Sequence, residues 1–195
     1  MKNLPNILTL MRVMLIPAIY LALLVPGHEG KWLAVGIYII AALSDFFDGW
    51  VARKYDVQSG FGRMLDPIAD KLMVAVVLVI LVDMRVLQDI HVIAALIILS
   101  REILVSGLRE YLIELQVGLP VTKLAKIKTA LQMTALGVLI SGEAGNALIP
   151  NIDQVRLALL WIAAMLTLIT GYDYLRLGMS HAPWVDADSD RENKI

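Results

Sequence analysis

Four aspartates gather in one short stretch of a chain that is otherwise mostly apolar. Asp45 and Asp48 are three residues apart, and Asp66 and Asp70 are four residues apart. Both spacings place the two side chains of a pair on one face of a helix. Carboxylates held this close repel one another unless cations neutralise them, and their oxygens are ligands that Mg²⁺ and Mn²⁺ prefer. The pattern therefore predicts a site for two divalent cations; the alternative is a set of ordinary helix-end carboxylates, with Asp66 capping its helix.

A second group of charged residues is basic and comes later in the chain. Its members are Arg101, Arg109 and Lys126, with Lys123 and Lys128 as further candidates. Arg101 lies well inside an apolar segment, where a guanidinium needs an anion such as a neighbouring carboxylate or a bound phosphate. The lysines have an alternative interpretation as topology signals or lipid-headgroup contacts. Metals beside an anion-binding pocket indicate phosphoryl transfer, in which a remaining carboxylate takes a proton from an alcohol.

The elements that must position these groups are predicted to be transmembrane helices. The chain has 195 residues and is 58% hydrophobic, which is too apolar for most soluble domains of this size. Apolar segments of roughly the ~20 residues needed to cross a bilayer recur along it. We predict an all-α, polytopic membrane protein that forms a single domain over residues 1–195, with a flexible tail at 181–195. The six predicted spans are a stretch that follows Arg12 and ends at Val25, then Trp32–Ala52, Asp66–Val82, Ile90–Ile113, Lys123–Ser141 and Gln154–Leu177.

Two further segments complete this prediction. Residues Met1 to Arg12 have a short amphipathic pattern that suits the membrane interface, although a cleaved signal peptide is the alternative interpretation. Residues Lys54 to Leu65 are predicted to form a polar connection, after which Asp66 and Pro67 open the third span, because proline is well tolerated in the first turn of a helix.

The basic residues predict the orientation in the membrane. With six spans and the amino terminus inside, all lysines and arginines except Lys31, Arg85 and Arg156 fall at the inner side. Such an asymmetry favours a cytoplasmic location for both termini. The carboxylates and the basic group would then lie on the same, cytoplasmic side. The net charge of −1 gives no reason to expect nucleic-acid binding, and without cysteine no disulfide or zinc–thiolate site is possible.

The aspartate stretch as a whole reads D-x-x-D-G-x-x-A-R-x8-G-x3-D-x3-D. This pattern resembles the signature of the CDP-alcohol phosphotransferase family, membrane enzymes of phospholipid synthesis that transfer a group from a CDP-linked donor to an alcohol and release CMP. All fixed positions are matched, including Gly49, Ala52, Arg53 and Gly62. The resemblance implies that these four residues shape the CDP-diacylglycerol site and that the protein is a homodimer.

The same resemblance assigns roles to the aspartates. It implies that Asp45, Asp48 and Asp66 bind two divalent cations, Mg²⁺ or Mn²⁺, and that Asp70 also contacts metal and acts as the general base. The stretches LPNILTLMR, DK, REILVSGLRE and KIKTALQ are similar to the branch of the family that makes phosphatidylglycerol phosphate in bacteria. That branch implies a location in the bacterial inner membrane and transfer of a phosphatidyl group from CDP-diacylglycerol to glycerol 3-phosphate.

Within this interpretation, Arg109 and Lys126 are predicted to contact the acceptor phosphate directly, while Arg101 orients Glu102 or neighbouring carboxylates. One alternative is a related enzyme with another acceptor, namely phosphatidylglycerol, inositol phosphate or serine; a basic pocket makes serine the poorest fit. An alternative of another class is a divalent-cation transporter. Transport sites usually lie near the bilayer midplane on broken helices, whereas these carboxylates are predicted at helix ends.

Overall fold

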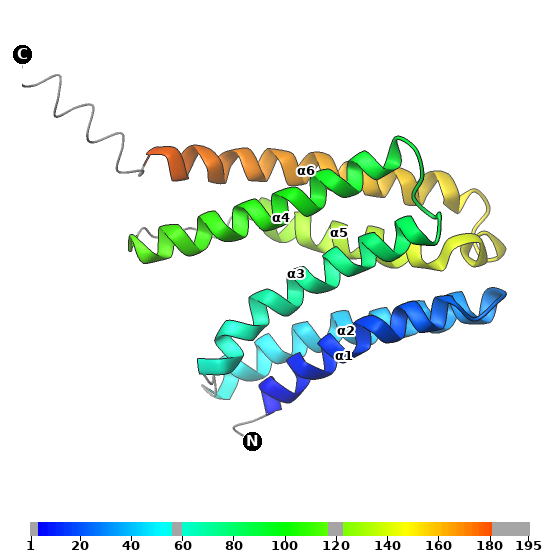
Figure 1. Cartoon of the computed structure of the whole chain (residues 1–195), viewed down its shortest axis with the longest axis horizontal. Helices are drawn as coiled ribbons and strands as arrows, with labels where there is room; N and C mark the ends of the chain where they lie inside the picture. The colour runs from blue at the N-terminus through cyan, green and yellow to red at the C-terminus, as the bar shows by residue number, and fades with distance from the viewer. Residues whose placement is uncertain (1–3, 56–59, 117–122, 181–195) are drawn as a thin grey trace, which may run out of the picture.

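A computed structural model describes residues 4–55, 60–116 and 123–180 of the chain. The described residues form six α-helices and one short 3₁₀ helix, which confirms the all-α prediction. In chain order these are α1 (Leu4–Leu23), α2 (His28–Tyr55), α3 (Gly60–Asp83), α4 (His91–Glu114), α5 (Lys123–Ser141), η1 (Gly142–Ala147) and α6 (Ile152–Ser180). The helices run alternately in opposite directions along one bundle (Figure 1).

The distribution of polar side chains is that of a membrane protein. Large apolar side chains such as Met14, Val79 and Ile103 are more than half exposed, while Thr9 and Arg12 are fully buried. In water such an apolar surface would drive aggregation, so a bilayer is the solvent that suits it. By length and composition, the described part of the chain holds three helical stretches that could cross a membrane: His91–Glu114, Leu124–Ala147 and Ile152–Arg176.

The bundle has two packed groups of helices that share a contact surface. The helix α1 packs on α2 and α3, and α6 packs on α4 and α5, while α2 and α3 contact α5. Tyr38 of α2 shows how close the α2–α5 contact is, because its ring lies where a side chain on Gly137 would stand, with a ring carbon 3.2 Å from an ideal Cβ. The Tyr38 hydroxyl donates to the Met133 carbonyl at 2.9 Å, which satisfies a polar group inside the bundle.

The boundaries of three predicted segments differ from the structure. The predicted polar connection at Lys54–Leu65 is wrong, because α2 continues to Tyr55 and α3 begins at Gly60. Asp66 and Pro67 therefore lie inside α3 and do not open it. Hydropathy detects where a chain leaves the hydrocarbon, but the backbone hydrogen-bond ladder continues through the polar residues beyond that point. The first span ends at Leu23 and not at Val25, in a helix, α1, that also includes most of the predicted amphipathic segment, and the predicted loop after Ser141 contains η1.

The alternation of the helices gathers the predicted site residues at one end of the bundle. At this end α2 finishes, α3 begins, α4 finishes, α5 begins and α6 finishes (Figure 1). We call it the site end. The connections α1–α2, α3–α4 and α5–α6 lie at the opposite end. The arrangement places the acidic stretch of α2 and α3 and the basic groups of α4 and α5 on the same side, as the sequence predicted.

Candidate active site

A pocket of about 200 Å³ opens between four helices toward the site end. Helices α3, α4 and α5 contribute most of its wall, and α6 contributes one aromatic side chain. The lining residues are Pro67, Asp70, Lys71, Arg101, Glu102, Val105, Ser106, Arg109, Ala125, Lys128, Thr129 and Tyr174. Charged residues thus form half of the wall of a pocket that lies within an apolar bundle.

The charges of this wall do not balance. Four of the lining side chains are cationic, namely Lys71, Arg101, Arg109 and Lys128, and two are anionic, Asp70 and Glu102. The described wall therefore has a formal charge of +2. In a low-dielectric environment an uncompensated charge is costly, and an anion bound in the pocket would remove that cost. The pocket is suited to a doubly charged anion of small size.

Glu102 organises the cationic side of the pocket. Its carboxylate oxygen Oε1 accepts a hydrogen bond from the Lys128 ammonium, and the same oxygen lies 3.4 Å from Nη1 of Arg101. All three side chains are largely buried, with exposed fractions of 15% for Glu102, 5% for Lys128 and 11% for Arg101. One carboxylate neutralises only one of its two cationic neighbours, so this group retains a positive charge for a ligand.

The structure brings three of the predicted residues together in the pocket. Asp70 from α3, and Arg101 and Arg109 from α4, all line it. Lys126 is exposed and is not among the lining residues, whereas Lys128 is buried and lines the pocket. Arg101 and Glu102 form an ion pair, and the predicted role of Arg101 in orienting Glu102 stays a prediction. The contribution of Lys126 to an anion site stays a prediction.

The remaining predicted residues lie outside the part whose side chains the structure describes. These are Asp45, Asp48, Gly49, Ala52, Arg53, Gly62, Asp66 and the further candidate Lys123. The backbone of α2 and α3 is helical at the aspartates, so each pair occupies one helix face. Among the described side chains, no group of three or more His, Cys, Asp or Glu residues is placed to hold a metal ion. Three of the four predicted ligands, Asp45, Asp48 and Asp66, are not among these described side chains.

Two contributors to the site were missed by sequence reasoning. Thr170 and Tyr174 of α6 contact Arg101, and the sixth span shows no motif in the sequence that would have indicated this. Lys128 was only a further candidate beside Lys126. Its signal was weak, because two lysines two residues apart point to different faces of a helix and the sequence alone does not tell which face is inside.

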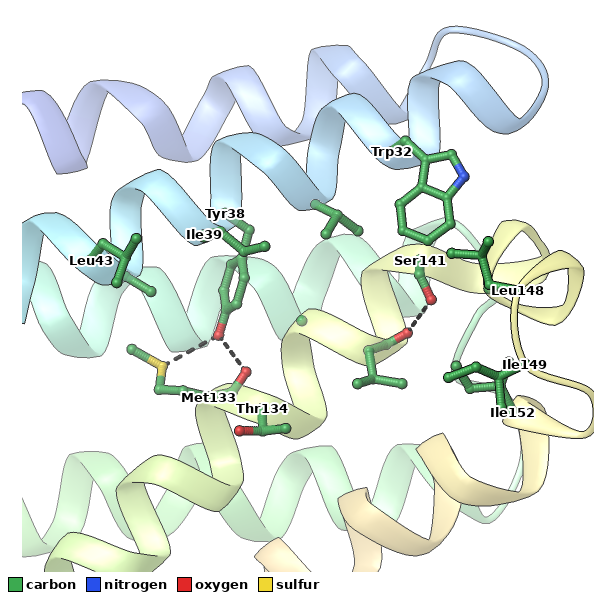
Figure 2. Close-up of a pocket in the computed structure, with 15 residues that line it drawn as sticks. Trp32, Tyr38, Ile39, Leu43, Met133, Thr134, Ser141, Leu148, Ile149 and Ile152 are labelled. Carbon is green, nitrogen blue, oxygen red and sulfur yellow. Dashed lines mark hydrogen bonds between the residues drawn. The ribbon is translucent and has the colours of Figure 1, made fainter.

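An apolar groove of about 400 Å³ lies between α2 and α5 and continues past η1 to the start of α6. Figure 2 shows its length, with Leu43 toward one end and Trp32 and Leu148 toward the other. Tyr38 stands in its wall with its hydroxyl turned to Met133. Leu43 is two residues before Asp45. The groove therefore leads along the bundle from the predicted metal site toward the opposite end, and its wall suits an alkyl chain.

Comparison with known proteins places the chain in one family. The sequence profile of the CDP-alcohol phosphatidyltransferase family matches residues 2–169. A protein of Rickettsia typhi called CDP-diacylglycerol–glycerol-3-phosphate 3-phosphatidyltransferase is 48% identical over 176 residues, which cover 90% of this chain and 97% of the relative.

More distant relatives carry the same description. The protein of Cereibacter sphaeroides is 37% identical over 218 residues, covering 92% of this chain and 96% of the relative. The protein of Shigella flexneri is 38% identical over 177 residues, covering 89% of this chain and 93% of the relative. The similarity therefore extends over nearly the whole length of each relative and includes the helices that form the pocket.

Proposed function

The chain belongs to the CDP-alcohol phosphatidyltransferase family, and from this premise we propose that it transfers the phosphatidyl group of CDP-diacylglycerol to glycerol 3-phosphate. The products are CMP and phosphatidylglycerol phosphate, an intermediate of phospholipid synthesis. The observation that carries the choice of acceptor is the pocket itself, in which Arg101, Arg109 and Lys128 lie near Asp70.

The charge of the pocket fits a phosphorylated acceptor. A phosphate monoester has a charge of about −1.5 to −2 at neutral pH, which matches the +2 of the described wall. Serine is a neutral zwitterion and would leave the cations uncompensated. Phosphatidylglycerol carries a single negative charge on a diester phosphate. Glycerol 3-phosphate supplies both the dianion and a free primary hydroxyl within a small volume.

The acidic stretch would hold two divalent cations, Mg²⁺ or Mn²⁺. Its donor set consists of carboxylate oxygens, and Asp70, the member whose side chain is described, lines the charged pocket. This fits the ligand preference of both ions. Asp45, Asp48, Asp66 and Asp70 are the residues that would bind them. When bound, such ions neutralise a diphosphate and polarise the phosphorus under attack.

The reaction follows from this placement. Asp70 takes the proton of the primary hydroxyl of glycerol 3-phosphate, and the hydroxyl oxygen forms a bond to the phosphorus that carries diacylglycerol. The bond from this phosphorus to the oxygen that bridges it to the CMP phosphorus breaks, and CMP leaves with that oxygen. Gly49, Ala52, Arg53 and Gly62 would shape the nucleotide-diphosphate site. An acyl chain of the donor would lie in the apolar groove between α2 and α5.

The remaining expectations concern the protein in the membrane. We propose that all six α-helices cross the inner membrane as one domain over residues 1–195, with both termini and the pocket on the cytoplasmic side. The distribution of lysine and arginine supports this orientation, because, within residues 4–55, 60–116 and 123–180, Lys31, Arg85 and Arg156 are the ones that lie toward the opposite end. The homodimer stays a prediction from the family resemblance.

The activity is tested with purified protein, CDP-diacylglycerol, Mg²⁺ or Mn²⁺ and a panel of acceptors. We expect CMP release and a new phosphomonoester lipid with glycerol 3-phosphate. Inositol phosphate, phosphatidylglycerol and serine serve as the alternative acceptors. Faster CMP release with any of these three would assign the protein to a different branch of the family, and metal uptake into vesicles without CMP release would indicate a transporter.

Substitutions in the acidic stretch separate its two roles. Asp48→Asn should abolish turnover, because an amide oxygen does not neutralise a divalent cation. Asp70→Asn should reduce turnover by about 10²–10⁴-fold, as expected for loss of a general base, while CDP-diacylglycerol binding falls less than in Asp45→Asn. Donor affinity is measured together with the rate. Equal loss of donor affinity in Asp70→Asn and Asp45→Asn would make Asp70 a metal ligand only.

Three substitutions locate the acceptor phosphate. Arg109→Gln and Lys128→Gln should each raise the KM for glycerol 3-phosphate much more than the KM for CDP-diacylglycerol. Loss of a charge-assisted hydrogen bond costs on the order of 1.5–3 kcal/mol, or roughly ten- to a hundredfold in KM. Lys126→Gln tests the contact that the sequence predicts for Lys126, which is exposed and does not line the pocket. A larger effect in Lys126→Gln than in Lys128→Gln would move the acceptor site toward the exposed face of α5.

The orientation is tested by labelling single cysteines. The chain has no cysteine, so a substitution introduces the only thiol. Glu29 and Glu114 are both exposed and lie at opposite ends of the bundle. In intact spheroplasts, a membrane-impermeant maleimide should label Glu29→Cys, whereas Glu114→Cys should react only after the membrane is permeabilised. The reverse pattern would contradict the cytoplasmic placement of the pocket.

A further inference from the structure

Arg101 lies at the boundary between two cavities of the bundle. It lines the charged pocket, and it also lines a largely apolar groove of about 490 Å³ that opens between α4 and α6. Packing alone does not hold a long, charged side chain at such a boundary, because arginine has several rotatable bonds. The contacts on the α6 side therefore decide where the charge of Arg101 lies.

Thr170 provides a directed contact of this kind. Its hydroxyl donates to the backbone of the preceding turn, with the Leu166 carbonyl at 2.9 Å and the Thr167 carbonyl at 3.2 Å, which leaves the hydroxyl oxygen free to accept. The hydroxyl oxygen then accepts a hydrogen bond from Nη2 of Arg101 at 3.0 Å. Because Nη1 of the same guanidinium lies toward Glu102, the two terminal nitrogens are held from two different helices. This orients the plane of the guanidinium as well as its position.

Gly171 and Tyr174, also on α6, make further contacts with the Arg101 side chain. Gly171 leaves space for the stem of Arg101, since a Cβ at residue 171 would lie only 2.9 Å from Arg101 Cγ. The ring of Tyr174 lies one turn further, with its centroid 5.9 Å from the central carbon of the guanidinium, within the range of a cation–π contact. Thr170, Gly171 and Tyr174 lie on one side of α6, and all three face Arg101: Thr170 through its hydroxyl, Gly171 through the space left by its missing side chain, and Tyr174 through its ring.

We propose that α6 positions Arg101 for the phosphate of the acceptor, with Thr170 and Gly171 as the positioning residues. The proposal deepens the proposed function and rests on it, because it takes glycerol 3-phosphate as the ligand of the pocket. Both residues lie beyond the segment matched by the family profile, which ends at residue 169. The helix that carries no sequence signature would thus determine how well the pocket binds its anion.

Thr170→Val tests the hydrogen bond, because valine keeps the shape of threonine and removes the hydroxyl. We expect the KM for glycerol 3-phosphate, and its Kd measured by calorimetry on protein in detergent, to rise about tenfold, as for loss of a hydrogen bond to a charged group. The KM for CDP-diacylglycerol should change less than twofold. Thr170→Ser retains the hydroxyl and should restore acceptor binding.

Thr167→Val is the matched control for this substitution. Thr167 is fully buried one turn earlier on α6, and its hydroxyl makes no hydrogen bond within the described part of the chain. It should leave acceptor binding unchanged. Equal increases in acceptor KM for Thr167→Val and Thr170→Val, or no increase in either, would overturn the proposal, since the hydroxyl contact to Arg101 would then have no specific effect.

Gly171→Ala tests, independently of hydrogen bonding, whether Arg101 needs the space that the missing side chain of Gly171 leaves. A methyl group there must displace Arg101, whereas Gly178→Ala places the same methyl group against Leu108, another α4 side chain. We expect Gly171→Ala to raise the Kd for glycerol 3-phosphate severalfold more than Gly178→Ala does. Equal effects would mean that only helix packing is disturbed and would contradict the proposal.

The failure of this inference is distinguishable from failure of the proposed function. Turnover of the unsubstituted protein with glycerol 3-phosphate tests the function alone. If another phosphorylated acceptor is the substrate, the comparison of Thr170→Val with Thr167→Val is made with that acceptor. A larger KM increase in Thr170→Val would support the positioning role, and equal values would overturn it.

Discussion

Glu102 shares its carboxylate between two cations in the interior of an apolar bundle, and the pocket depends on that contact. Lys128 and Arg101 come from different helices, and each would be costly to bury without an anion nearby. Glu102 lowers this cost without removing the whole charge. Without Glu102, Arg101 and Lys128 would be buried beside each other with no shared anion, and with Glu102 the described wall of the pocket still has a formal charge of +2. A bound anionic ligand would neutralise the positive charge that remains in the pocket.

The rest of the bundle can be understood from this constraint. A bilayer allows an apolar outer surface on the helices that cross it, and polar side chains such as Thr9, Arg12 and Gln132 are buried inside the bundle. Around the pocket, Lys128 approaches Glu102 of α4 from α5, while Thr170 approaches Arg101 of α4 from α6. Three helices are therefore tied together by polar contacts at the level of the pocket. The hydrophobic effect contributes little between helices in lipid, so such contacts and close packing carry the association.

Much of this architecture could be predicted from the sequence, for a physical reason. Apolar segments long enough to cross a bilayer locate the helices without any knowledge of their partners. The predicted start of the third helix at Asp66 was wrong, because hydropathy marks the edge of the hydrocarbon and α3 begins before that edge, at Gly60. The sequence predicted Asp70, Arg101 and Arg109 on one side of the membrane, because they lie toward the same end of their helices, and in the structure all three line one pocket.

Partners across helices were harder to predict. A helix that is apolar on all sides gives no periodic signal for its rotation, so nothing in the sequence told which of Lys126 and Lys128 faces inward. The contact of Thr170 with Arg101 joins residues 69 positions apart, which no local pattern encodes. The functional role of α6 therefore becomes visible only when the helices are placed side by side.

The position at which the acceptor phosphate binds is the most direct test of the role of the pocket. An experimental structure of the protein with glycerol 3-phosphate alone, without donor, would measure this. We predict the phosphate within hydrogen-bond distance of Arg101, Arg109 and Lys128, with the primary hydroxyl toward Asp70. A phosphate found outside this pocket, with Lys128 and Arg101 still paired to Glu102 and making no contact to the ligand, would contradict the account.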